Sequence, residues 1–241
     1  MAQFQFRKFE LLPVVIKNLI IINVLVWIAQ ITLGRSFPIT DLFALHDVRS
    51  ELFRPHQIIT HMFMHDPSGP GHLLFNMLAL WMFGSALENV WGAKRFLIFY
   101  VASGLGAAAL HLAVLWFQNS ELINAANSGM LGQQLRSIGF DEGVGEYVRL
   151  KLNEPTLGAS GAVFGCLAGF GYLFPNTYIY LYFFIPVKAK WFVLGYAALE
   201  LYSGVAATAG DNVAHFAHLG GAIVGFLLVY YWNKSNRRNF Y

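Results

Sequence analysis

The segment LGASGAVFGCLAGF, residues 157–170, places one serine, Ser160, at the start of a run made almost entirely of small and apolar residues. Glycines recur at every fourth position after it, at Gly161, Gly165 and Gly169. A stripe of small residues at this spacing lets two helices in a membrane approach until their backbones nearly touch. The serine itself allows two interpretations. It either fills space and bonds to its own helix, or it is a nucleophile that a neighbouring base activates.

The composition indicates a membrane protein. Of the 241 residues, 56% are hydrophobic and 12% are charged, whereas a soluble domain carries about 25% charged residues. The apolar residues form six runs, each close to the length that crosses a bilayer as a helix. These expected spans are residues 14–33, 72–91, 95–117, 158–175, 190–208 and 213–232.

The six spans predict an all-α membrane protein with one membrane domain, residues 14–232. A short N-terminal segment (1–13) precedes this domain and a basic tail (233–241) follows it. Two long loops, at about 34–71 and 118–157, connect the spans on one side of the membrane. The apolar residues within the first loop favour short amphipathic helices at the membrane surface.

The distribution of basic residues predicts the orientation. If both termini are cytoplasmic, ten of the 16 lysines and arginines lie on the cytoplasmic side and six lie outside, although the outside loops are much longer. The six outside are Arg35, Arg49, Arg54, Arg136, Arg149 and Lys151. An excess of basic residues marks cytoplasmic loops, so we expect both termini in the cytoplasm. The net charge of +3 has this membrane explanation, and we expect no nucleic-acid partner.

Several polar side chains lie inside the expected spans, where each one calls for a reason. His72 and Asn76 open the second span and share one helical face, because they are four residues apart. Ser160 opens the fourth span, and His218 lies about one turn and a half into the sixth. In the predicted topology these three spans all start outside, so the polar residues lie at a similar depth.

The glycine spacing predicts that the fourth and sixth spans are neighbours, because the sixth carries Gly221 and Gly225 on a matching small-residue face. Such packing brings Ser160 and His218 within reach of each other. A histidine can take the proton of a serine hydroxyl, which is a poor nucleophile without a base. His72, Asn76 and the backbone N–H of Ser160 are the available donors for an oxyanion.

These residues resemble the rhomboid family of intramembrane serine proteases. The resemblance covers residues 14–232 and is carried by three motifs: HLLFN (72–76), GASGAVFG (158–165) and AHLGGAIVG (217–225). It implies a six-helix rhomboid-like bundle that cleaves membrane-protein substrates in or near their transmembrane helices, within the lipid bilayer and without a metal or cofactor.

The resemblance also implies roles for individual residues. Ser160 is the expected nucleophile, and His218 is the expected general base of a dyad that has no carboxylate partner. His72, Asn76 and the Ser160 amide form the expected oxyanion hole. The expected supporting residues are Gly158, Phe164, Gly221 and Gly225, together with Glu88 as a structural polar residue in GSALENVWG (84–92).

The chain departs from the family pattern in three places. Phe164 occupies a position where the family often has a tyrosine stacked on the histidine. Phe53 and Arg54 stand where a tryptophan–arginine pair is usual. The 118–157 loop is longer than in minimal members and is expected to cover or narrow the path by which a substrate reaches the site.

Other interpretations stay open at this point. Four histidines in the first loop, His46, His56, His61 and His65, could be metal ligands, although their pattern lacks the glutamate of a zinc-protease motif. Glu200 could relay protons in a transporter, but it is more simply a protonated or hydrogen-bonded group within the bundle, and we take His215 as structural.

The main alternative function is a non-catalytic rhomboid-like protein that binds membrane helices for quality control or trafficking. We expect a bacterial cytoplasmic membrane as the location. The sequence does not indicate the oligomeric state or the substrate.

Overall fold

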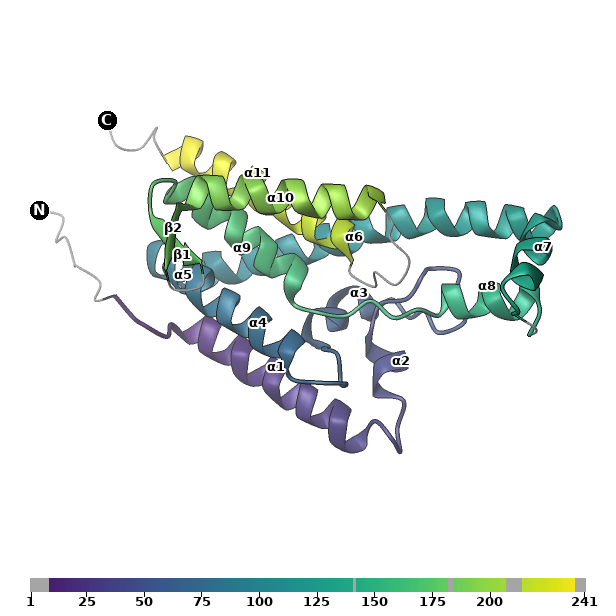
Figure 1. The fold of residues 1–241 in the computed structure, drawn as a ribbon. Coiled ribbons are helices and arrows are strands. Elements are labelled where there is room, and N and C mark those ends of the chain that lie inside the picture. Colours follow the sequence, from purple (N-terminus) through teal and green to yellow (C-terminus); the bar gives the residue numbers. More distant parts are fainter. Residues whose placement is uncertain (1–8, 141, 182–183, 207–213, 237–241) are drawn as a thin grey trace, which may run out of the picture.

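The computed structural model describes residues 9–140, 142–181, 184–206 and 214–236, and these are mostly helical (Figure 1). Six helical segments of the described residues form the bundle, and one of them consists of three consecutive elements. They are α1 (Val14–Leu33), α4 (Gly71–Ala79) continuing through the π-helical turn η2 (Leu80–Gly84) into α5 (Ser85–Trp91), α6 (Ala93–Asn127), α9 (Ser160–Leu173), α10 (Ala189–Ala206) and α11 (His215–Asn236).

Among the described residues, four helical segments are long and apolar enough to cross a membrane: Val14–Leu33, Gly71–Trp91, Ala93–Asn127 and His215–Lys234. The other two expected spans correspond to α9 and α10. Helix α9 has only 14 residues, or roughly 21 Å of helix against a hydrocarbon core of roughly 30 Å. It nevertheless has ten buried residues, so neighbouring helices rather than lipid surround most of it.

The orientation of the helices agrees with the expected topology. In Figure 1, α1 begins and α11 ends at the same end of the bundle, while α4, α9 and α11 all begin toward the opposite end. The location of both termini in the cytoplasm stays a prediction from the charge distribution.

Short elements fill the connections. They are α2 (Ile39–Phe43), α3 (Gln57–Thr60) and the 3₁₀ turn η1 (His61–Phe63) in the first loop, α7 (Met130–Ser137) and α8 (Val144–Leu152) in the second, and the antiparallel hairpin of β1 (Tyr178–Leu181) and β2 (Ile185–Lys188) between α9 and α10. The first loop contains short helices, as its apolar residues predicted, and their position at the membrane surface stays a prediction. The sequence analysis did not predict the hairpin.

The third span ends later than expected, at Asn127 instead of 117. The apolar run stops near Phe117, but no glycine or proline follows until Gly129, so nothing interrupts the helix as its side chains become polar. Gly129 ends the extension with a φ of +79°, a conformation that favours glycine. The end expected for the fifth span, 208, and the start expected for the sixth, 213, lie outside the described residues.

Buried polar side chains hold the first loop against α1 and α6. Gln30 of α1 donates to the His65 carbonyl and accepts from the His65 N–H, both at 2.9 Å. Asp47 accepts hydrogen bonds from Arg49 and from Asn119 of α6. Burial tends to raise the pKa of the Asp47 carboxyl, but these hydrogen bonds outweigh burial and hold that pKa below its usual range.

The four histidines of the first loop do not form a metal site. The rings of His46, His56 and His61 each donate to a different backbone carbonyl, and the His65 ring bonds to the Asn23 side chain at 2.9 Å. These histidines therefore act as separate structural hydrogen-bonding groups.

Glu88 caps the first helix. Its two carboxylate oxygens accept the backbone N–H groups of Val15 and Ile16, each at 3.0 Å. The first N–H groups of a helix have no partner within the helix, and a carboxylate also interacts favourably with the helix dipole. Glu88 therefore has the structural role that the resemblance implied.

The closest packing in the bundle lies between α9 and α11, as the glycine spacing predicted. A Cβ atom added at Gly221 would overlap the Gly161 carbonyl oxygen, and one added at Gly225 would lie 2.7 Å from the Gly165 Cα atom. Helix α11 also contacts α6 closely, because a Cβ atom at Gly220 would lie 2.6 Å from the Gly106 carbonyl oxygen.

We predict that Gly221→Ala destabilises the protein strongly, because the added methyl group must push two backbones apart. An overpacked contact costs about 3 kcal/mol, which corresponds to a fall in Tm of roughly 6–12 °C for a chain of this size. Thermal unfolding in detergent measures the effect. The matched control is Gly195→Ala on α10, where an added Cβ atom meets nothing within 4 Å; equal Tm values for both variants would contradict the packing argument.

Candidate active site

Ser160 is the first residue of α9, and the chain that leads to it is fixed by hydrogen bonds. Thr156 pairs with Leu45 of the first loop, and the Gly158 N–H donates to the His61 carbonyl at 3.0 Å. Gly158 has a φ of +130°, which only glycine adopts without strain. The Ser160 side chain is half-buried, and its N–H points out of the start of the helix, where the helix has no acceptor for it.

His218 lies over the first turn of α9. Its ring stacks on Phe164, with centroids 4.2 Å apart and planes 4° from parallel, and Phe164 is four residues, or about one turn, after Ser160. The substitution of phenylalanine for the usual tyrosine therefore preserves the ring contact. Within the described residues the Ser160 hydroxyl makes no hydrogen bond to His218; in enzymes without substrate such bonds are often long and shorten when substrate binds.

One edge of the His218 ring meets a carboxylate. The Nδ1 atom of His218 lies 2.8 Å from Oε2 of Glu200 on α10, and the Nδ1 atom of His215 lies 2.7 Å from the same oxygen. This contact corrects the expectation of a histidine without a carboxylate partner. An isolated glutamate within an apolar helix was the sequence signal, but spacing within α10 does not reveal which helix that glutamate faces.

The hydrogen bond to Glu200 determines the protonation of the neutral His218 ring. A carboxylate accepts only, so Nδ1 must carry the proton and Nε2 keeps its lone pair. Nε2 is thus available to accept a proton, as a general base must.

The neutral His72 ring has the opposite tautomer to the neutral His218 ring. The Asp66 backbone N–H donates to the Nδ1 atom of His72 at 3.3 Å, so the neutral ring carries its proton on Nε2. A Cβ atom built on Gly158 would lie 3.1 Å from this Nε2 and 3.3 Å from the Ser160 hydroxyl oxygen. The His72 donor and the serine therefore border the same small space beside Gly158.

Asn76 is buried and lies one turn after His72 on α4. Its amide nitrogen donates to the His72 carbonyl at 2.9 Å, which uses one of its two N–H bonds. The second N–H is the group that an oxyanion could use.

One group of side chains among the described residues could hold a metal ion. The ligand atoms of Glu200, His215 and His218 lie within 4.8 Å of one another, and two imidazoles with one carboxylate form a donor set known from zinc sites. The two hydrogen bonds described above already account for the position of these three side chains.

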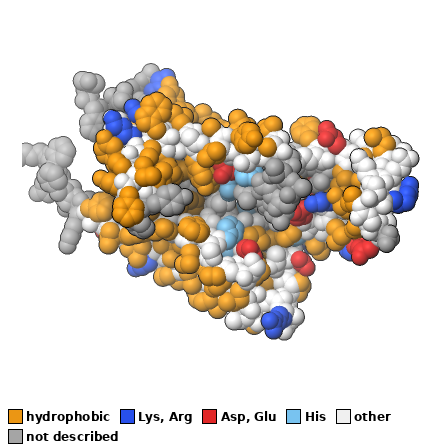
Figure 2. All heavy atoms as spheres, viewed as in Figure 1, with side chains coloured by type: hydrophobic (Ala, Val, Ile, Leu, Met, Phe, Trp, Pro, Cys, Tyr) orange, Lys and Arg blue, Asp and Glu red, His pale blue; other side chains and the backbone are white. Residues whose placement is uncertain are grey.

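The surroundings of the site fit a membrane protein. Figure 2 shows apolar side chains over most of the bundle, polar side chains at the end formed by α7 and α8, and histidines near the middle of this face.

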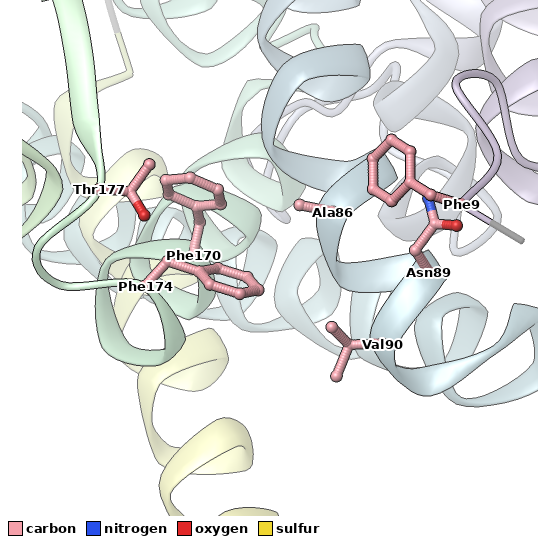
Figure 3. Close-up of a pocket in the computed structure, with 7 residues that line it drawn as sticks. All are labelled: Phe9, Ala86, Asn89, Val90, Phe170, Phe174 and Thr177. Carbon is pink, nitrogen blue, oxygen red and sulfur yellow. The ribbon is translucent and has the colours of Figure 1, made fainter. Parts of the chain in front are cut away.

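A separate pocket lies between α9 and α5, near the end of α9 that is farther from Ser160 (Figure 3). None of its lining residues titrates near neutral pH, so it offers no acid–base chemistry. The residues that line this pocket are Phe9, Ala86, Asn89, Val90, Phe170, Phe174 and Thr177.

Comparison with known proteins identifies the family. The rhomboid domain model matches residues 51–235. The chain is 32% identical over 164 residues to "Rhomboid protein 1, mitochondrial" of Saccharomyces cerevisiae, which covers 68% of this chain and 38% of that protein. It is 30% identical over 230 residues to "RHOMBOID-like protein 12, mitochondrial" of Arabidopsis thaliana, covering 94% and 60%. "Rhomboid protease GluP" of Bacillus subtilis is 28% identical over 171 residues, covering 70% and 24%.

The chain belongs to the rhomboid family of multi-pass integral membrane proteins. It spans 38% and 60% of the lengths of the first two relatives.

We predict that Gly158→Ala slows covalent modification of Ser160 by a fluorophosphonate at least about tenfold, because the strained backbone and the added methyl group disturb both His72 and the serine. The labelling rate in detergent measures this. Gly69→Ala is the control, since an added Cβ atom there meets nothing within 4 Å. Equal rates for Gly158→Ala and the control would show that the conformation at Gly158 does not matter.

Proposed function

We propose that this protein is an intramembrane serine endopeptidase, with Ser160 as nucleophile and His218 as general base. The observation that carries the proposal is the position of the His218 ring. It is stacked on Phe164 one turn from Ser160, and its Nδ1 atom is bonded to Glu200, which leaves Nε2 as the basic atom. The named relatives that are rhomboid proteases support the same reaction class.

The proposed reaction begins when Nε2 of His218 removes the proton of the Ser160 hydroxyl as its oxygen bonds to the carbonyl carbon of the substrate. The carbonyl electrons move to oxygen and form an oxyanion. His218 then gives its proton to the peptide nitrogen, the C–N bond breaks, and an amine leaves an acyl-enzyme. Water attacks the acyl group, His218 takes the proton of the water, and that proton returns to Ser160 when the new carboxylic acid leaves.

Three donors are proposed to stabilise the oxyanion: Nε2–H of His72, the second amide N–H of Asn76 and the backbone N–H of Ser160. The first is supported by the hydrogen bond from Asp66 to Nδ1 and the third by the position of Ser160 at the start of α9. Fixed donors of this kind typically contribute roughly 2.7–4 kcal/mol each to the transition state.

The proposed substrates are membrane proteins, cleaved in or near a transmembrane helix. Support comes from the short, largely buried helix α9, which starts at the proposed nucleophile, and from the many exposed apolar side chains of the bundle, part of which Figure 2 shows on one face. Helix α10 buries only two of its residues, Ala189 and Glu200, so we propose α10 and the first loop as the parts that move when a substrate approaches. The extended α6 and helices α7 and α8 make up most of the loop at 118–157, and we propose that they cover or narrow the path by which a substrate reaches the site.

The alternative is a non-catalytic family member that binds membrane helices. The presence of both Ser160 and His218, with the His218 ring over the turn of α9 that begins with Ser160, favours the protease. The location in a bacterial cytoplasmic membrane stays a prediction, because the relatives carry mitochondrial, chloroplastic and bacterial names.

We predict that a fluorophosphonate labels the wild-type protein in detergent and labels neither Ser160→Ala nor His218→Ala, because the first lacks the nucleophile and the second lacks the base. Ser137→Ala, an exposed serine on α7, is the matched control and should label like wild type. Labelling retained in Ser160→Ala would identify a different nucleophile.

A model transmembrane substrate reconstituted with the protein in liposomes tests the full reaction. The proposal requires cleavage by wild type and none by Ser160→Ala. Wild-type protein that neither labels nor cleaves would support the non-catalytic alternative.

A further inference from the structure

We propose that Glu200 is a positioning residue that completes a Ser160–His218–Glu200 triad, which places one member of the catalytic apparatus on the peripheral helix α10. This inference rests on the proposed function and extends it, since the resemblance implies a dyad without a carboxylate.

Glu200 is a buried carboxylate on a largely apolar helix, so a specific interaction must compensate the cost of burying it. Its exposed fraction is 6%, and a carboxylate is costly to bury in a membrane protein unless it is hydrogen-bonded. The rest of α10 consists mainly of half-buried and exposed apolar residues. The carboxylate is not paired with a cation of its own helix; it reaches across to α11, where it accepts from His218 at 2.8 Å and from His215 at 2.7 Å.

Stacking alone does not orient the His218 ring fully. The near-parallel contact with Phe164 fixes the plane of the imidazole, but a half-turn about the bond to the ring keeps the same plane and exchanges the nitrogen edge with a carbon edge. The hydrogen bond to Glu200 distinguishes these two arrangements, because only one of them presents Nδ1–H to the carboxylate. Phe164 therefore sets the plane, and Glu200 sets the rotation and the tautomer.

The same bond supports the reaction as charge develops. When Nε2 takes the serine proton, the ring becomes an imidazolium, and a carboxylate 2.8 Å from Nδ1 stabilises that positive charge. His215 donates to the same carboxylate oxygen from one turn earlier on α11, with its ring at 89° to that of His218. This second bond holds the Glu200 side chain at the edge of the catalytic ring.

Glu200→Gln tests the proposal, because it keeps the size of the side chain and removes the charge. In proteoliposomes with a model transmembrane substrate, we predict a fall in kcat of at least about 100-fold with KM changed less than about threefold. Glu200→Asp keeps the carboxylate and should recover part of the lost kcat. The matched control is Glu10→Gln, an exposed glutamate ahead of α1, and it should cleave like wild type.

The outcomes distinguish failure of the positioning role of Glu200 from failure of the protease proposal. If wild type cleaves and Glu200→Gln keeps a kcat within about threefold of it, the positioning role is wrong and the protease proposal stands. If wild type itself does not cleave, the protease proposal fails first.

A second measurement needs no variant of Glu200 and so does not depend on such a variant folding. Nitrogen NMR of the Ser160→Ala protein labelled with ¹⁵N-histidine, with the His218 signals assigned by their loss in His218→Gln, reports which ring nitrogen carries the proton. Protonation of the neutral ring at Nδ1 supports the inference. Protonation at Nε2 would overturn it.

Discussion

The close contact between α9 and α11 is the constraint on which the rest of the structure depends. Gly161 faces Gly221 and Gly165 faces Gly225, and no side chain larger than hydrogen fits at the contact of Gly221 with the Gly161 carbonyl. A membrane provides little hydrophobic force between helices, so close backbone packing must supply much of the attraction. This packing also fixes the relative depth of the two helices and brings His218 over the turn that begins with Ser160.

Hydrogen bonds between buried polar groups fix the positions of the elements that the glycine contacts do not reach. In an apolar solvent an unpaired polar group is costly, so each hydrogen bond among these groups favours one arrangement over its alternatives. Glu88 ties the end of α5 to the start of α1, and Gln30 ties α1 to the first loop. The first loop in turn holds the Gly158 segment, so a chain of polar contacts leads from the beginning of the bundle to Ser160.

Much of this arrangement is readable from the sequence. Apolar runs predicted the helices, and glycine spacing predicted which two helices would touch. The sequence could not reveal that Glu200 meets His218, because periodicity gives the face of a helix and not the neighbour of that face. It also misplaced the end of α6, because hydropathy marks where a helix leaves apolar surroundings and not where its hydrogen bonds stop. The two strands between α9 and α10 lie in the connection between the expected fourth and fifth spans, but hydropathy marks only the limits of that connection and not the pairing of its strands.

Helix α10 buries only Ala189 and Glu200, and Glu200 is bonded to Nδ1 of His218, the proposed general base. Any movement that tilts α10 away from α11 must therefore pull the carboxylate from the imidazole. In the proposed protease, a substrate helix that displaced α10 on entry would break this bond, and the reaction would require α10 to return to its place. Under the proposed mechanism, a membrane helix that keeps α10 displaced would therefore not be cleaved.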